Sequence, residues 1–93
     1  MLAQFPIDLE KVSKENLDKE ILRLGIIAEL DAVSLYEQLA DATDNQDMKK
    51  VLLDIASEEK VHIAEFKTML DKMDKEQVDM DKEGSDEVNE MVG

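Results

Sequence analysis

Three side chains of this sequence could together bind a metal ion: Glu29, Glu59 and His62. Glu59 and His62 are three positions apart, so in a helix they project from the same face. His62 is the only histidine in the chain. A carboxylate and an imidazole are costly to bury in an apolar face unless something pairs with both, and a metal ion meets that need.

Glu59 and His62 lie in a segment that is predicted to be a helix ending at about Met73 and capped by Asp44 or Asn45. Alternating steps of four and three residues along it trace one stripe, which the pattern predicts to be the buried seam against other helices. The stripe consists of Met48, Leu52, Ile55, Glu59, His62, Phe66, Met69 and Met73.

Glu29 belongs to an earlier predicted helix, from Lys14 to Ala42, with Ser13 as its N-cap. Its middle part, residues 21–36, is apolar on almost every side. A helix of that kind is covered on every side. One partner helix cannot do this, so we expect a second copy of the chain to cover the rest.

The neighbours of Glu29 add three expectations. Gly25, one turn earlier, is interpreted as a point where another backbone comes close. Tyr36 lies two turns later on the same face, whereas Asp31 lies on a different face.

The turn at residues 43–46 is short enough to fold the two helices into an antiparallel hairpin. Glu29 precedes it by about as many residues as Glu59 follows it, so Glu29, Glu59 and His62 are predicted to meet at one level. Carboxylates and one imidazole, without a thiolate, suit iron(II), manganese or zinc. A Glu from one helix and Glu-x-x-His from the next form half of a di-iron carboxylate site, so two chains would complete it.

The expected fold class is all-α: residues 14–74 form the hairpin, between an N-terminal arm at 1–13 and a short acidic C-terminal helix or tail at 75–93. The arm, which contains Phe5-Pro6-Ile7, shows no helical period and is predicted to be extended. The third helix is predicted near residues 75–82, begun by the pair Asp74 and Gln77 and stopped by Gly84, with Ser85 capping a last turn or two.

Composition narrows the function. The net charge of -13 argues against binding nucleic acid or an anionic membrane and favours cations. The absence of cysteine excludes disulfides and thiolate ligands. No apolar run is long enough to span a bilayer, so a cytoplasmic location is the default expectation.

Three runs of the sequence resemble the encapsulated ferritins: IAELDAVSLYEQ at 27–38, VLL at 51–53 and EEKVH at 58–62. The resemblance is closest to the ferritin-like domain that some archaeal encapsulins carry fused to the N-terminus of the shell protein. It covers roughly residues 14–74 and extends more loosely through the tail.

That resemblance implies a two-helix subunit that pairs into a ferritin-like four-helix bundle with a di-iron ferroxidase centre between the two chains. It further implies ring-shaped assemblies, typically decamers, that oxidise Fe(II) with dioxygen and supply iron for storage inside an encapsulin nanocompartment. By position, Glu29, Glu59 and His62 correspond to the catalytic iron ligands, and Tyr36 to a tyrosine beside the centre.

The sequence also departs from the family. Some members carry further acids that form an outer metal-uptake site; here Ala28 replaces one of them and Asp31 retains the other. Leu35 stands where some relatives have tryptophan. Residues 87–93 do not resemble an encapsulin-targeting peptide, so the chain is expected either to be part of a longer fusion or to reach a shell by another route.

Two other functions remain open from the sequence: a rubrerythrin-like di-metal peroxidase, and a helical assembly module in which the polar trio only specifies chain pairing.

Overall fold

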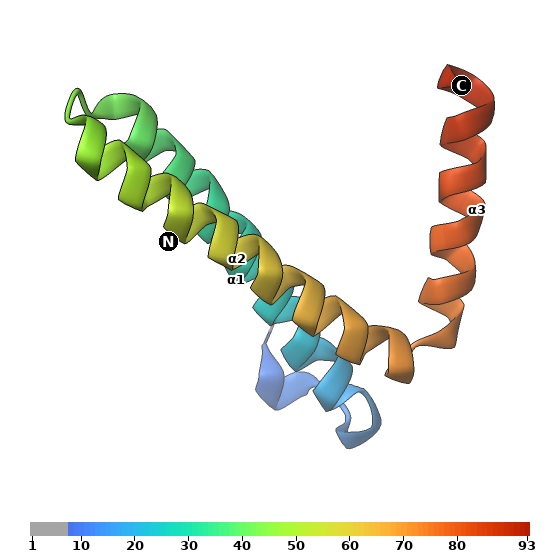
Figure 1. Cartoon of the computed structure of the whole chain (residues 1–93). Coiled ribbons are helices and arrows are strands. Elements are labelled where there is room, and N and C mark those ends of the chain that lie inside the picture. Colours follow the sequence, from blue (N-terminus) through green and yellow to red (C-terminus); the bar gives the residue numbers. More distant parts are fainter. Residues whose placement is uncertain (1–7) are drawn as a thin grey trace.

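The computed structural model describes residues 8–93, which are helical and contain no strand (Figure 1). Phe5-Pro6-Ile7 of the predicted arm lies outside the described residues. The described end of the arm is not extended throughout, because Leu9–Lys11 forms a short 3₁₀ helix (η1). The side chain of Asp8 caps this turn by accepting a hydrogen bond from the backbone N–H of Glu10 at 3.1 Å, which the absence of a helical period did not indicate.

Two long helices, α1 (Lys14–Ala42) and α2 (Gln46–Met73), lie side by side as an antiparallel hairpin (Figure 1). Asn45 is the N-cap of α2, and its side chain accepts a hydrogen bond from the backbone N–H of Met48 at 3.0 Å. Ser13 is the N-cap residue of α1, although its side chain makes no capping bond to the helix backbone. The hairpin and the bounds predicted for α1 and α2 are confirmed.

The third helix, α3 (Lys75–Val92), is longer than predicted. The sequence interpretation stopped it at Gly84 and began a new turn at Ser85, but the helix continues through both residues. Glycine costs only about 1 kcal/mol against alanine within a helix, and nothing lies within 4 Å of the position that a Cβ would take at Gly84. The two flanking turns are therefore enough to keep the segment helical.

Asp74 alone joins α2 to α3, and α3 leaves the hairpin at a wide angle (Figure 1). The backbone N–H of Asp74 donates to the carbonyl of Leu70 at 2.9 Å and so ends α2. Its side chain accepts from the backbone N–H of Gln77 at 3.1 Å, which starts α3, and from the Arg23 guanidinium of α1 at 2.9 Å. A further link is made by Lys67 of α2, which donates to Asp81 of α3.

The core of the single chain is sparse. Among the described residues only Ala40, Ala56 and Leu70 are buried. The radius of gyration is 16.5 Å, against about 12 Å for a compact domain of this length. The hairpin and α3 thus leave much apolar surface open.

The predicted stripe on α2 is only partly buried. Leu52, Ile55 and Phe66 are half-buried, whereas its three methionines are largely exposed, at 52% for Met48, 46% for Met69 and 39% for Met73. The prediction of a buried seam is therefore wrong for the isolated chain, because α2 presents the neighbouring face, with Ala56 and Leu70, to the interior of the hairpin.

No helix within residues 8–93 has the length and apolar character needed to cross a membrane.

Candidate metal centre

Glu29 of α1 meets Glu59 and His62 of α2 halfway along the hairpin. Nδ1 of His62 lies 3.4 Å from Oε2 of Glu29 and 3.4 Å from Oε2 of Glu59. One ligand atom from each of the three residues lies within 4.8 Å of the others. Ligand atoms held about 2.1 Å from a first-row metal ion stand about 3 to 4 Å apart. The sequence prediction that these residues share one level is confirmed.

The two carboxylates are poorly solvated and poorly compensated. The side chains of Glu29 and Glu59 are only 20% and 19% exposed, whereas that of His62 is 48% exposed. Within the part of the chain that the structure describes, Oε2 of Glu29 is buried and has no hydrogen-bond partner. Leaving such an oxygen unsatisfied is unfavourable. A cation bound between the three side chains would remove the penalty, so the donor set and its burial fit a metal ion.

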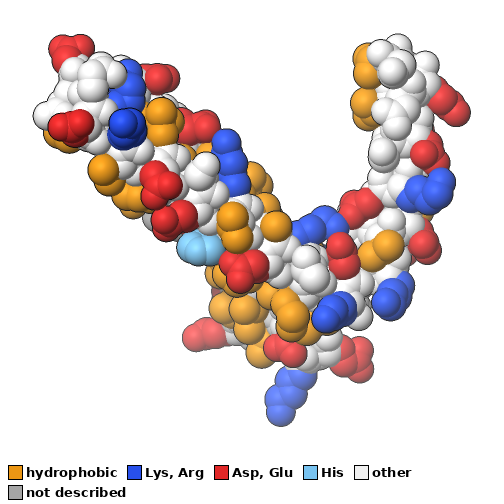
Figure 2. Space-filling model, in the orientation of Figure 1, with side chains coloured by type: hydrophobic (Ala, Val, Ile, Leu, Met, Phe, Trp, Pro, Cys, Tyr) orange, Lys and Arg blue, Asp and Glu red, His pale blue; other side chains and the backbone are white. Residues whose placement is uncertain are grey.

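A hollow of about 290 Å³ opens in front of the group and is lined by Glu29, His62, Glu65 and Phe66. In Figure 2 the histidine, in pale blue, lies at the surface of the hairpin among red acidic and orange apolar side chains. The approach from solvent thus lies on the histidine side, while the two glutamates form the deeper part of the group.

Two residues of this hollow were not selected as site residues from the sequence. Glu65 is exposed, yet it also lines the hollow. Phe66 was treated as one apolar member of the stripe. Its spacing from His62, one turn further along α2, was the signal that could have placed it beside the site.

Gly25 was expected to mark the approach of another backbone. The neighbour is instead the aromatic ring of Phe66, whose Cε2 lies 3.2 Å from the position that a Cβ would take at Gly25. A close neighbour is therefore present at Gly25, and within residues 8–93 its nearest atoms belong to a side chain of α2 rather than to a backbone.

Tyr36 and Asp31, the other two residues singled out from the sequence, are half-buried on α1. The carboxylate of Asp31 does not belong to the group of converging ligand atoms. Their suggested roles, support of the metal ligands for Tyr36 and metal uptake for Asp31, stay predictions.

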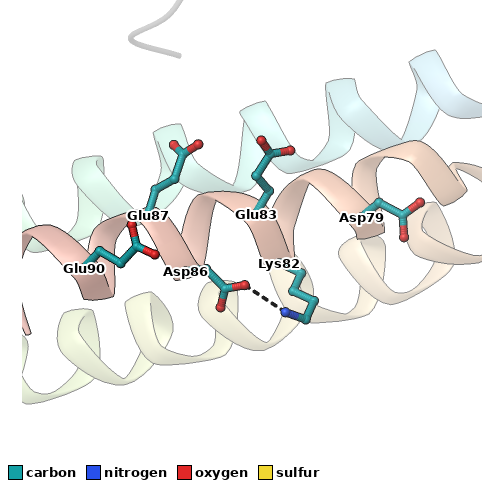
Figure 3. A pocket seen from close by; sticks show the side chains of 6 residues that line it. All are labelled: Asp79, Lys82, Glu83, Asp86, Glu87 and Glu90. Atoms are coloured by element: carbon teal, nitrogen blue, oxygen red, sulfur yellow. Dashed lines mark hydrogen bonds and ion pairs between the residues drawn. The ribbon is translucent and has the colours of Figure 1, made fainter.

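A second hollow, of about 420 Å³, lies along α3. Figure 3 shows its lining, in which the carboxylates of Glu83 and Glu87 point away from the helix and Lys82 pairs with Asp86. All of its lining residues come from this one helix: Asp79, Lys82, Glu83, Asp86, Glu87 and Glu90. Because no second element converges on it, this hollow lacks the geometry of a built site.

Comparison with known proteins first identifies the family to which the chain belongs. The rubrerythrin family model matches residues 20–91, and the chain therefore belongs to the rubrerythrin family. The expected all-α, ferritin-like fold class is confirmed.

Within that family, the similar proteins found include encapsulated ferritins and encapsulin cargo proteins. The resemblance inferred from the sequence is confirmed. The chain superimposes on the crystal structure of the encapsulated ferritin domain from Pyrococcus furiosus with a TM-score of 0.86, at 45% identity, covering 100% of this chain and 97% of that one.

Two curated relatives agree. A ferritin-like–encapsulin shell fusion protein of Pyrococcus furiosus is 52% identical over 81 residues, which are 87% of this chain and 23% of that protein. The encapsulin nanocompartment cargo protein EncC of Myxococcus xanthus is 42% identical over 69 residues, 71% of this chain and 53% of that protein. The chain thus spans about a quarter and about half of these two relatives.

Proposed function

We propose that this chain is a ferroxidase that oxidises Fe(II) with dioxygen at a di-iron site shared between two copies, and that it supplies iron for storage inside an encapsulin nanocompartment. The observation that carries the proposal is the convergence of Glu29, Glu59 and His62, with a buried carboxylate oxygen that no described group satisfies. Membership of the rubrerythrin family supports an iron-related role for this donor set.

The three side chains would have different roles in binding iron, set by their charge and their exposure. Glu29 and Glu59 provide two negative charges in a poorly solvated setting, which favours the higher oxidation state of the metal. His62 adds a neutral nitrogen ligand and, because it is exposed, lies where Fe(II) reaches the site. A pair of bound iron ions would supply the electrons for the reduction of dioxygen.

A second copy of the chain would complete this site. One chain provides two carboxylates and one imidazole, which leaves coordination positions open on the side of His62. Exposed apolar side chains lie at helical spacing from His62 on α2, namely Val51, Met69 and Met73, and Leu30 follows Glu29 on α1 with 53% exposure. Pairing would cover them and bring four glutamates and two histidines together as a four-helix bundle. Further assembly into a ring, such as a decamer, belongs to the same proposal.

An encapsulin shell is the proposed partner, because one curated relative is a fusion to an encapsulin shell and the other is an encapsulin nanocompartment cargo protein. The chain would then act in the cytoplasm, inside that compartment, and the acidic surface would attract Fe(II) rather than nucleic acid or anionic membrane. Co-expression with an encapsulin shell protein tests this: the chain should elute with the assembled shell, and elution apart from it would refute the partnership.

The activity is tested by anaerobic Fe(II) titration followed by exposure to air, with native mass spectrometry on the same samples. We expect even-numbered assemblies that bind one iron per chain and oxidise it. Glu59→Ala and His62→Ala should reduce oxidation to the uncatalysed background, whereas Glu58→Ala, the exposed neighbour, should match the parent. Oxidation at the parental rate in Glu59→Ala and His62→Ala would contradict the assignment.

The rubrerythrin match favours one second candidate, a di-metal peroxidase acting at the same three residues. Comparing hydrogen peroxide with dioxygen as the oxidant of the Fe(II)-loaded protein separates the two. Faster oxidation by dioxygen at equal concentration supports the ferroxidase, and oxidation by peroxide alone supports the peroxidase. Even-numbered assemblies that bind no iron would leave a non-catalytic assembly module.

A further inference from the structure

We propose that Phe66, seated against Gly25, is a positioning residue that sets the spacing of α1 and α2 at the metal-binding level. This inference rests on the proposed metal site at Glu29, Glu59 and His62. It assigns a role to two residues that do not themselves offer a ligand.

The ring of Phe66 leaves little room for a side chain at Gly25 of α1. A Cβ atom at Gly25 would lie 3.2 Å from Cε2, 3.3 Å from Cδ2 and 3.4 Å from Cζ of Phe66. Three atoms of the ring therefore lie closer to this Cβ position than most Cβ contacts in proteins allow. Any residue larger than glycine at this position would push the ring, the helix or both.

This contact lies one turn from the ligands on both helices. Gly25 precedes Glu29 by four residues and Phe66 follows His62 by four, which corresponds to about 6 Å along each helix. Phe66 also lines the same hollow as Glu29 and His62. A displacement of the ring is thus transmitted to the wall of the site rather than to a distant surface.

The size of the displacement matters because metal sites tolerate little. A methyl group added at Gly25 would lie 3.2 to 3.4 Å from three ring atoms, so the ring or the helix would have to move by a few tenths of an ångström. Metal–ligand distances are held to about 0.2 Å. Changes in residues that orient metal ligands commonly cost about 10- to 100-fold in affinity.

The chain offers a matched control. Gly84 is also a glycine within a helix, but nothing lies within 4 Å of the Cβ position there. Gly84→Ala therefore makes the same chemical change in open space. A difference between Gly25→Ala and Gly84→Ala reports the contact with Phe66 and not the loss of a helical glycine.

The experiment is anaerobic titration of the full chain with Co²⁺ alone, read as a dissociation constant and as the ligand-field absorption spectrum. We expect Gly25→Ala to weaken Co²⁺ binding about 10-fold and to shift the spectrum, and Gly84→Ala to leave both unchanged. The double variant Gly25→Ala/Phe66→Leu should bind more tightly than Gly25→Ala alone, because the smaller side chain makes room for the methyl group.

Co²⁺ binding at the parental affinity and with the parental spectrum in Gly25→Ala would overturn the proposal, even if the metal-free protein melted earlier. Additive losses in the double variant would also overturn it, since they would show that the two positions act separately. If Gly25→Ala does not fold, Phe66→Leu alone decides: weaker binding supports the role and parental binding refutes it.

The proposed function fails in a different way. In that case the parent itself would bind Co²⁺ no better than His62→Ala, whatever residue occupies position 25. Parental binding that depends on His62, together with an unaffected Gly25→Ala variant, would refute only the role of Phe66.

Discussion

Two places where charged side chains of different helices meet are balanced very differently: the corner around Asp74 and the middle of the hairpin. At the corner around Asp74, the carboxylate accepts hydrogen bonds from Gln77 and Arg23. At the middle of the hairpin, Nδ1 of His62 lies 3.4 Å from each of Glu29 and Glu59, and the buried oxygen of Glu29 accepts no hydrogen bond within residues 8–93. A fully paired carboxylate stabilises its fold, whereas a buried one without partners is kept at a cost and so indicates a ligand.

The largest effect is expected for Glu29→Gln, which tests whether the Glu29 carboxylate is unpaired. This substitution keeps the shape of the side chain and removes its charge. We expect metal affinity to fall at least about 100-fold. In the presence of a chelator, the free energy of unfolding should rise, by up to about 1–3 kcal/mol, because the buried oxygen no longer belongs to an unpaired anion. Metal titration and thermal unfolding measure the two effects.

Glu58→Gln is the control for that variant, since Glu58 is exposed on the same hairpin. It should change neither quantity. Lower stability of metal-free Glu29→Gln would show that the Glu29 charge is compensated by the fold and would remove the contrast with Asp74.

The opposite result is expected for Asp74→Ala. This substitution removes the N-cap of α3 and the acceptor of Arg23, so the thermal midpoint should fall by several degrees while metal affinity stays at the parental value. Asp79→Ala, an exposed acid of the same helix, is the matched control. An unchanged midpoint for Asp74→Ala would show that the corner does not depend on its side chain.

Acid should weaken the same corner. The hydrogen bond from the backbone of Gln77, with that from Arg23, lowers the pKa of Asp74 below 3.8, and the hydrogen bond from Lys67, with that from Gln77, lowers the pKa of Asp81. The stability they contribute is therefore fully present above pH 3.8 and is lost as the pH falls through the lowered values.

A high pH should weaken the same corner through Lys67. Hydrogen bonds to Asp71 and Asp81 raise its pKa above 10.5, so its contribution is complete below pH 10.5 and is lost as the pH rises through the raised value. The midpoint difference between parent and Asp81→Asn should be constant from pH 5 to 9 and shrink outside the two limits. A difference that varies within this range would contradict these pairings.

The smallest expected effect is that of Gly84→Ala. It replaces a helical glycine that has no neighbour, so α3 should gain up to about 1 kcal/mol, visible as retained helical circular dichroism at higher temperature. Metal affinity should not change. A loss of helicity would show that α3 needs a glycine at this position.

Local patterns were enough to predict α1, α2 and the meeting of Glu29 with Glu59 and His62, because periodicity, capping residues and the distance from the turn act along the chain. They failed for the length of α3, since one glycine does not end a helix whose flanking turns hold. They also failed for the exposure of Met48, Met69 and Met73. A periodic pattern identifies an apolar face but not the chain that covers it, and so it could not place Phe66 against Gly25 either.

Because a single residue joins α2 to α3, the direction of α3 depends on the rotation about the helix axis at which α2 ends. Each residue of a helix turns its end by about 100°, and one joining residue leaves no slack to absorb such a turn. Inserting one residue into the last turn of α2 should swing α3 to another side of the hairpin and break its contact between Lys67 and Asp81. An insertion of seven residues, two nearly complete turns, should restore its heading. The length of α2 is therefore expected to vary only in steps of whole turns.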